Sequence, residues 1–232
     1  MPRRARAIAG GMAYHVLNRA VGRQVLFDGS GDYKAFEQVL EQAHRRDPLR
    51  ILAYCIMPNH WHLVVWPDPG RDDQLSSFMH WLTMTHTQRW HAFHGTTGTG
   101  PLYQGRFKAF PIQTDEHLWT VIRYVERNPL RAGLVPRCEA WQWSSLWRWA
   151  HGGRENDRQL GAWPLTAGGR PTNWLELVNQ AQTEAELQAI RASISRNRPF
   201  GSREWTTRIA ANLGLECAIR PRGRPRRATA HA

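Results

Sequence analysis

The sequence is poor in cysteine and has no long hydrophobic run. Its three cysteines, Cys55, Cys138 and Cys217, are far apart and odd in number, which argues against a disulfide framework or a zinc knuckle. No apolar stretch is long enough to span a bilayer, and no hydrophobic segment follows the basic residues at 1–6 to make a signal peptide. We therefore expect a reduced, cytoplasmic protein with no membrane partner.

Acidic residues are also scarce relative to basic ones. The chain has 19 Asp and Glu against 31 Lys and Arg, which gives a formal net charge of +12 and a pI of about 10.8. Such an excess of positive charge is typical of proteins that bind a polyanion. The 232 residues give room for one full domain and a smaller appendage. We expect most of the twelve tryptophans to be structural and some to be stacking platforms for unpaired bases.

The order of the expected elements predicts a ferredoxin-like fold of the α/β (α+β) class. The alternating segment 14–18 is expected to be a strand, and apolar residues at helical spacing predict one helix capped by Asp32 and a second that ends near Phe93. Two strands joined by a turn at Pro58 and Asn59 lie between them. This β-α-β-β-α-β order predicts an antiparallel sheet with helices packed on one side. The apolar helix positions are Tyr33, Phe36, Val39, Leu40 and Ala43, and then Leu75, Phe78, Met79, Leu82 and Met84.

The stretch 57–65, Met-Pro-Asn-His-Trp-His-Leu-Val-Val, carries the first candidate site residues. Side chains on a strand alternate between faces, so His60 and His62 project from one side while Trp61 and Leu63 project from the other. Two imidazoles that point the same way beside an apolar anchoring face are a potential pair of metal ligands that lacks a third. Such a pair also occurs by chance on many strands, so a site needs a partner elsewhere in the chain.

A candidate partner lies on a helix that we expect Asp115 to cap. At about 3.6 residues per turn, Tyr124, Asn128 and His117 line up along the shoulder of the apolar stripe of this helix. That position leaves the tyrosine hydroxyl partly exposed while the ring leans on the core, as a nucleophile requires. A structural tyrosine that anchors a helix to a sheet would give the same pattern. Pro129 biases Asn128 away from helical geometry, so we expect Asn128 just off the helix end.

A His-hydrophobic-His strand followed by a helical tyrosine with an amide residue four positions later resembles the single-tyrosine HUH transposases of the IS200 type. The resemblance covers roughly 12–149 and implies the HUH endonuclease fold. The ending Tyr-x-x-x-Asn-Pro-x-x-Ala-x-Leu-Val, here 124–135, is most similar to the REP-associated tyrosine transposases. Relatives often carry His two residues after the tyrosine, where this chain has Glu126. We expect Glu126 to lie off the tyrosine's face of the helix and to leave the chemistry unchanged.

The chemistry explains why these residue types belong together. A phenol with an ordinary pKa of about 10 is mostly protonated at neutral pH, so Tyr124 needs help to attack a phosphodiester. A divalent cation held by His60, His62 and the amide oxygen of Asn128 would polarise the scissile phosphate. Neutral nitrogen and oxygen ligands do not single out one metal, but a partly hydrated site for phosphate oxygens suits Mg²⁺ or Mn²⁺, as the resemblance also implies. Water and His117 are alternative third ligands.

These residues predict a transposase, which is a single-strand DNA endonuclease and strand transferase that cuts near DNA hairpins through a 5′-phosphotyrosine intermediate. Because the ester is exchanged rather than hydrolysed, no nucleotide cofactor is needed. Two alternatives stay open, a noncatalytic hairpin-binding protein that kept the fold and a nuclease that acts on RNA. The sequence also leaves open whether the protein is a monomer or a homodimer.

Apolar residues alternate with basic and amide residues in the stretch 103–110. On a strand, Gln104, Arg106 and Lys108 would share one face, and such a row of donors without acids is typical of a phosphate contact. The alternative is an ordinary half-exposed strand with solvated charges. We predict that these three side chains contact DNA.

The chain is expected to comprise four segments. These are a catalytic HUH domain at 1–150, a glycine-rich linker at 151–170, a small helical domain at 171–219 and a basic tail at 220–232. The tail surrounds Gly-Arg-Pro with arginine and resembles an AT-hook, which enters the minor groove of DNA. The alternative is a disordered basic tail. The tail arginines assigned to DNA contact are Arg222, Arg224 and Arg226.

Overall fold

The computed structural model describes residues 8–152, 160 and 170–220. Its centre is an antiparallel sheet in which the strands follow the spatial order β2-β3-β1-β4. Two of them, β2 and β3, form a hairpin whose turn is Pro58 and Asn59, as predicted. The strands are β1 (Ala13–Arg19), β2 (Arg50–Met57), β3 (His60–Trp66) and β4 (Lys108–Ile112). The predicted mixed α/β class and antiparallel sheet are confirmed.

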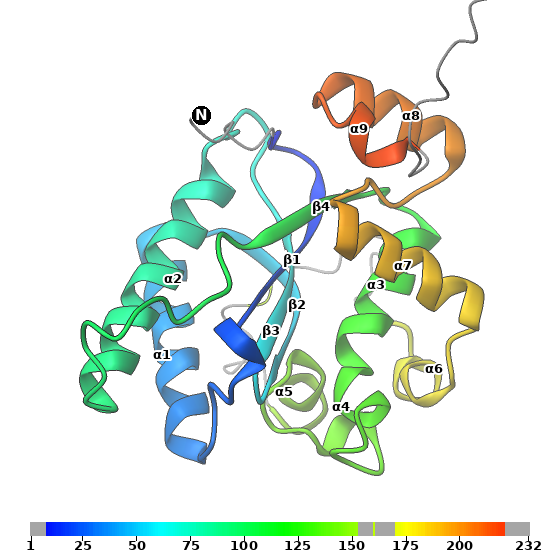
Figure 1. Cartoon of the computed structure of the whole chain (residues 1–232). Coiled ribbons are helices and arrows are strands. Elements are labelled where there is room, and N and C mark those ends of the chain that lie inside the picture. Colours follow the sequence, from blue (N-terminus) through cyan, green and yellow to red (C-terminus); the bar gives the residue numbers. More distant parts are fainter. Residues whose placement is uncertain (1–7, 153–159, 161–169, 221–232) are drawn as a thin grey trace, which may run out of the picture.

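Helices cover both faces of this sheet (Figure 1). On one face lie α1 (Ser30–Arg46) and α2 (Gln74–Phe93). On the other lie α3 (Glu116–Glu126) and α5 (Ser145–His151), with α6 (Trp174–Asn179) and α7 (Glu184–Arg196) packed against α3. The shorter or peripheral elements are η1 (Val21–Arg23), α4 (Asn128–Arg131), η2 (Cys138–Ala140), α8 (Arg203–Asn212) and α9 (Glu216–Ile219). No helix in the described part of the chain is long and apolar enough to cross a membrane.

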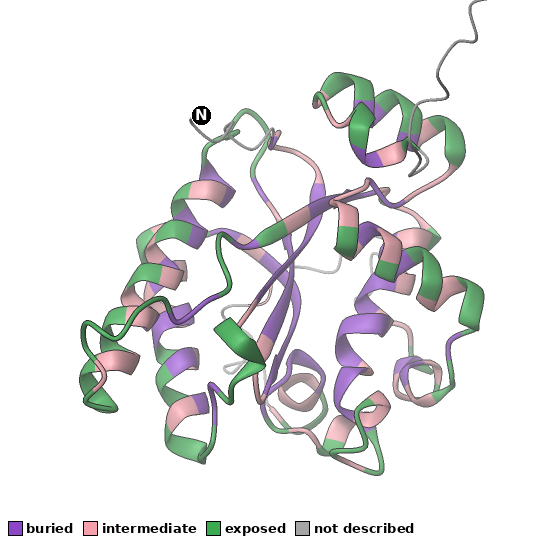
Figure 2. Ribbon diagram, in the orientation of Figure 1, coloured by how far each residue is buried: buried purple, intermediate pink, exposed green. Residues whose placement is uncertain are grey.

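The prediction that helices pack on one side only was wrong, because the strands are apolar on both faces. In β2, Tyr54 and Ile56 are buried under α1 and α2, whereas Cys55 and Met57 are buried on the α3 side. A strand that is apolar on both faces needs cover on both. Figure 2 shows the resulting burial concentrated on the strands and on α3.

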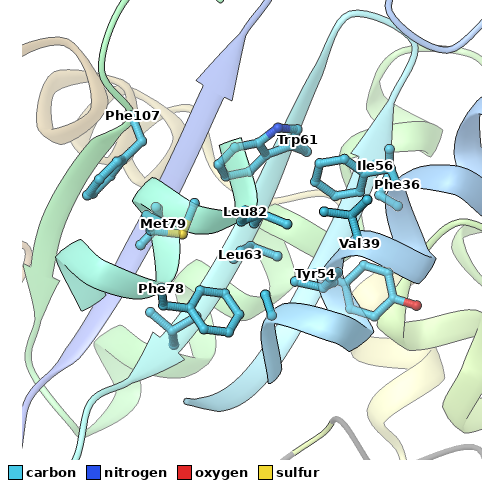
Figure 3. Packing of buried hydrophobic residues seen from close by; sticks show 14 of the residues in the cluster. Phe36, Val39, Tyr54, Ile56, Trp61, Leu63, Phe78, Met79, Leu82 and Phe107 are labelled. Atoms are coloured by element: carbon cyan, nitrogen blue, oxygen red, sulfur yellow. The ribbon is translucent and has the colours of Figure 1, made fainter. Parts of the chain in front are cut away.

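The predicted apolar positions of α1 and α2 form the core on the first face. All five positions of α1 are buried, and so are four of the five positions of α2. Figure 3 shows Trp61 and Leu63 of β3 packed among them. The exception is Met84, which is 48% exposed. It lies about 200° around the helix from Leu82, because each residue turns the helix by about 100°.

Two helix starts test the predicted caps. Asp115 is the N-cap of α3 as predicted, and its carboxylate accepts the backbone N–H of His117 at 2.9 Å. For α1 the prediction was wrong, because Gly29 is the N-cap and Asp32 is the third helical residue. The carboxylate of Asp32 reaches back and accepts the backbone N–H of Asp28 at 3.0 Å. An acid in the first turn still stabilises the helix start.

A buried polar chain crosses the core beneath α2. The hydroxyl of Tyr103 accepts the indole N–H of Trp61 at 3.0 Å and lies 2.7 Å from Nδ1 of His86. Burial lowers the pKa of His86 to about 3, so the ring is neutral and its Nδ1 accepts the Tyr103 hydroxyl. These hydrogen bonds fix the segment before β4 to both α2 and β3.

The strand predicted at 103–110 is shorter than expected and starts at Lys108. Before it, Tyr103 makes only an isolated bridge with Ala20, and Asn18 donates a side-chain N–H to the carbonyl of Gly105 at 3.2 Å. A ladder with β1 forms only from Lys108 onward. The exposure pattern nevertheless follows the predicted alternation. Gln104, Arg106 and Lys108 are exposed, whereas Tyr103 and Phe107 of the predicted apolar face are buried and Ala109 is half-buried.

The C-terminal helices pack on the outer side of α3. Arg123 of α3 donates to the carbonyl of Leu177 at 3.1 Å, and Arg127 donates to the carbonyls of Val178 and Asn179. These carbonyls belong to the last turn of α6, where the helix itself supplies no partners. Arg123 and the C-cap residue of α3, Arg127, therefore cap α6. The predicted domain boundaries stay a prediction, and most of the predicted linker and tail lie outside the described residues.

Glu126 completes this contact from the interior. Its side chain is fully buried, and its carboxylate accepts from Ser145 at 2.7 Å, from Trp174 at 2.8 Å and from Arg170 at 2.7 and 2.8 Å. The carboxylate therefore joins α3, α5 and the start of α6. Glu126 thus makes a buried ion pair that the sequence did not reveal, with partners that lie outside the candidate site.

We predict that replacement of Glu126 destabilises the fold. In Glu126→Gln the buried Arg170 loses its charge partner, and breaking a buried ion pair costs about 3 kcal/mol of the free energy of unfolding. Urea denaturation measures this loss. The matched control is Glu116→Gln on the same helix, where the side chain is 83% exposed and the expected change is about 0.5 kcal/mol. Similar losses in the two variants would contradict the assigned role of Glu126.

We also predict that the buried neutral histidine makes the fold sensitive to acid. The pKa of an unfolded histidine is about 6.5, whereas His86 in the fold titrates near 3. Below pH 6.5 the unfolded chain therefore binds a proton that the folded chain does not, and stability falls with pH. The expected loss from His86 between pH 6.5 and pH 5 is about 2 kcal/mol. Urea unfolding at pH 7.5 and 5.0 should show a smaller loss for His86→Gln than for the wild type, and equal losses would refute it.

Candidate active site

His60 and His62 project from β3 toward α3, as their alternation with Trp61 and Leu63 predicts. His62 is 3% exposed and His60 is half-buried. Their ring centroids are 5.0 Å apart, and the ring planes are nearly perpendicular. The sheet therefore presents the two imidazoles side by side on the face that α3 covers.

A third histidine, which the sequence did not single out, lies beside this pair. His15 of β1 is fully buried, and its Nε2 lies 2.8 Å from Nδ1 of His62. The two rings are stacked with centroids 5.0 Å apart. In the sequence, His15 alternates with Tyr14 and Val16, which places it on the other face of its strand. This alternation points to the site only once β1 is known to pair with β3.

Tyr124 of α3 approaches the histidines from above the sheet. Its ring centroid lies 6.1 Å from that of His62 and 6.2 Å from that of His15, with the planes nearly perpendicular in both cases. The side chain is 7% exposed, so it is more buried than the expected shoulder position. No hydrogen bond to another described residue holds its hydroxyl. The fold thus brings together a tyrosine and a histidine pair that lie more than 60 residues apart in the sequence.

Asn128 lies just beyond the end of α3, as predicted, but the expected departure from helical geometry was wrong, because Asn128 is the first residue of the short helix α4. It is 7% exposed, and its Nδ2 atom is buried without a hydrogen-bond partner. Nitrogen and oxygen of an amide are assigned from such partners, so an unpaired buried amide end is compatible with an oxygen ligand in that place. The next residues place Arg131 at the end of α4, where its guanidinium carbon lies 4.0 Å from the Tyr124 ring centroid.

His117, the alternative third ligand, is held elsewhere. It precedes Tyr124 by two helical turns, or about 10 Å along the axis. Its Nδ1 lies 2.7 Å from the carboxylate of Asp115, and its ring packs on Phe200. Together with Glu116, these two polar residues form a cluster in which one ligand atom from each lies within 4.8 Å of the others. This possible metal site is separate from the histidine pair.

The histidines beside Tyr124 are neutral. Burial lowers the pKa of His15 and of His60 to about 3, and lowers that of His62 well below its usual range. The positive charges of Arg19 and Arg131 act in the same direction on His60 and His62. Neutral imidazole is the form that binds a metal ion.

The hydrogen bonds of the pair fix which nitrogens remain for a metal. Nδ1 of His60 is engaged by the side chain of Asn59 at 2.6 Å, and Nδ1 of His62 is engaged by His15. This leaves Nε2 of each ring outside these hydrogen bonds, and an outer hydrogen bond on Nδ1 is the usual arrangement of metal-binding histidines. With the amide of Asn128, the donor set fits a divalent cation.

The predicted DNA-contact residues fall into two groups. Gln104, Arg106 and Lys108 are exposed, and Lys108 donates to the carbonyl of Ile194 in α7 at 3.3 Å. In β4, Lys108 lies opposite Leu17 of β1, next to the strand that carries His62. The tail arginines lie outside the described residues. Contact of either group with DNA stays a prediction.

The chain is similar to known proteins in sequence and in fold. The family model described as "Transposase IS200 like" matches residues 9–128, which is more than half of the chain. The REP-associated tyrosine transposase of Escherichia coli (strain K12) is 24% identical over 167 residues, which make up 72% of this chain and 90% of that protein. A solved REP-associated tyrosine transposase bound to a REP hairpin aligns with a TM-score of 0.52 at 22% identity, over 74% of this chain and 97% of that chain.

The similarity to that solved structure shows the shared fold, and the extent of the family match shows the family that the resemblance implied. On this evidence, the chain belongs to the IS200-like transposase family.

Proposed function

We propose that this protein is a metal-dependent single-strand DNA endonuclease and strand transferase in which Tyr124 is the nucleophile. Membership of a transposase family supports a DNA-processing enzyme. The observation that carries the proposal is the convergence of Tyr124 on the ring of His62, with centroids 6.1 Å apart. A tyrosine that only anchored α3 to the sheet would have no need of neutral imidazoles beside it.

The metal ligands proposed are Nε2 of His60, Nε2 of His62 and the amide oxygen of Asn128. A hydrated Mg²⁺ or Mn²⁺ ion bound there would polarise the scissile phosphate and stabilise its developing negative charge. His15 positions the ligand His62, because a proton on Nδ1 of His62 donates to Nε2 of His15 and leaves Nε2 of His62 free of protons.

The reaction exchanges one phosphate ester for another. The phenol oxygen of Tyr124 forms a bond to phosphorus as the bond from phosphorus to the 3′ oxygen breaks. The phenol loses its proton and the departing 3′ oxygen gains one, so the products are a 5′-phosphotyrosine and a free 3′-hydroxyl. That hydroxyl, or another one, can reverse the step, and this is why a nucleotide cofactor is not needed. Burial of the tyrosine ring keeps the nucleophile in one orientation.

We propose single-stranded DNA with hairpins as the substrate. The net charge of +12 and the exposed Gln104, Arg106 and Lys108 support a nucleic-acid partner. The solved relative named above is bound to a REP hairpin, which supports the same substrate class here. All three cysteines are free, which supports the cytoplasm as the compartment.

We predict covalent capture of DNA by Tyr124. The wild type, incubated with candidate hairpin DNA and Mg²⁺ or Mn²⁺, should give an adduct on a denaturing gel. Tyr124→Phe should give none because it lacks the attacking oxygen, and EDTA or His60→Ala should lower the yield by at least about 100-fold. Tyr33→Phe is the matched control, since Tyr33 is a buried tyrosine on α1, in the core of the opposite sheet face.

The outcomes separate the alternatives. Hairpin binding without an adduct in any metal would favour a noncatalytic DNA-binding protein, and an adduct with RNA but not with DNA would favour a ribonuclease. An adduct that survives in Tyr124→Phe would refute the assigned nucleophile.

We predict that His15 sets the metal affinity of the site. His15→Phe preserves the ring packing but removes the acceptor for Nδ1 of His62, so the affinity for Mn²⁺ should fall by about 10- to 100-fold. His15→Gln offers an amide acceptor and should recover part of the loss. Mn²⁺ titrations of the Tyr124→Phe protein with bound hairpin DNA measure the effect. Equal affinities in the Phe and Gln variants would show that the hydrogen bond has no such role.

A further inference from the structure

Two arginines flank the site, and their positions are fixed by different elements. Arg131 ends α4, and its guanidinium makes a cation–π contact with Tyr124, with its central carbon 4.0 Å from the ring centroid. One of its N–H groups donates to the backbone carbonyl of Tyr124 at 3.4 Å. Arg19 ends β1 and lies opposite His60 in the β1–β3 pairing.

Neither arginine has an acidic partner among the described residues. No carboxylate oxygen of the described residues forms an ion pair with Arg131 or Arg19, whereas the charged arginines Arg191 and Arg127 act on Arg131. Nε of Arg19 is buried without a hydrogen-bond partner. Both arginines are half-buried. A guanidinium stays charged in a protein, and even partial burial of a charge without an acidic partner is unfavourable. The site therefore has positive charge that the described part of the protein does not balance.

We propose that Arg131 and Arg19 bind the non-bridging oxygens of the phosphate that Tyr124 attacks. This inference rests on the proposed function. Stacking uses the face of the Arg131 guanidinium and leaves most of the N–H groups on its edge for phosphate oxygens. Because the guanidinium rests on the nucleophile's own ring, it holds the phosphate next to the attacking oxygen. Arg131 is thus a further catalytic residue, and Arg19 approaches from the strand side.

The charges of the two arginines also set the order in which the metal ion and the DNA phosphate bind. His60, His62 and Asn128 are neutral ligands, so a divalent cation that enters the free protein meets Arg131 and Arg19 without any balancing negative charge. A bound phosphate supplies that charge. The metal therefore binds weakly before DNA and more tightly with it, and removal of one arginine should have opposite effects on these two states.

Metal titration tests whether removal of one arginine changes the metal affinity in opposite directions with and without DNA. Mn²⁺ binding to the Tyr124→Phe protein is measured from the electron paramagnetic resonance signal of free Mn²⁺, with and without hairpin DNA. Addition of Arg131→Gln should tighten Mn²⁺ binding to the free protein about threefold, because a nearby positive charge is removed. The same change should weaken Mn²⁺ binding in the presence of DNA, because the phosphate is held less firmly. Arg208→Gln, which removes an exposed charge on α8, is the matched control and should change neither.

A merely structural role for Arg131 would lower both affinities together, so a fall in both, or no change in either, overturns the proposal. Arg131→Lys keeps the charge without the planar fork, and should resemble the parent protein in the absence of DNA.

Adduct formation separates this inference from the proposed function. In the protein with Tyr124 intact, Arg131→Gln should slow adduct formation by about 100-fold, as removal of one charge-stabilising donor does in other enzymes. An adduct that forms at the wild-type rate in Arg131→Gln overturns the role of Arg131 and leaves the proposed function intact. A wild-type protein that forms no adduct removes the proposed function, and the role of Arg131 with it.

Discussion

The site depends on the register between β1 and β3. In this pairing Leu17 lies opposite His62 and Arg19 lies opposite His60, so that His15 reaches the ring of His62 from the neighbouring strand. A slip of one residue would turn every side chain of β1 to the other face. It would place His15 in the α1–α2 core and leave Val16 in the site. The face on which His15 is buried, opposite that of Tyr14 and Val16, therefore ties the site to this register.

The proposed nucleophile comes from an element that the sheet alone does not hold. Tyr124 lies on α3, whose inner face packs on the sheet through its apolar stripe. Its outer side is held by Arg123 and by the C-cap residue Arg127, which donate to the end of α6, while Glu126 pairs with Arg170 in the interior. A catalytic side chain is positioned well only if the element that carries it is rigid. The C-terminal helices are thus part of what positions the tyrosine, although the sequence suggests a separate appendage.

The sequence predicts those features that depend on local pattern. The alternation around His60, the turn at Pro58, the buried stripe of α1 and the Asp115 cap all follow from residues close together in the chain, and the structure confirms them. The family and the convergence of Tyr124 on the histidines could be predicted because a known motif joins two distant segments.

Features that depend on pairing between distant segments could not be predicted. His15 becomes recognisable only when β1 is placed beside β3, and Glu126 only when Arg170 is placed beneath α3. Arg131 is one of many arginines in a basic chain until α4 folds it over Tyr124. Met84 fits an apolar pattern of the kind that predicts α2, yet helical geometry turns it to solvent. In each case the missing information is a contact in three dimensions.

The charges of the site follow from the same burial. Burial and nearby arginines both lower the pKa of His60 and of His62, and so both favour the neutral imidazole that binds metal. A carboxylate ligand would hold a divalent cation more firmly, but it would also neutralise Arg131 and repel a phosphate. Under the proposed function, a site of neutral ligands, with arginines that have no acidic partner among the described residues, would receive its negative charge from the phosphodiester. The balance of charge at Tyr124 would then depend on the substrate.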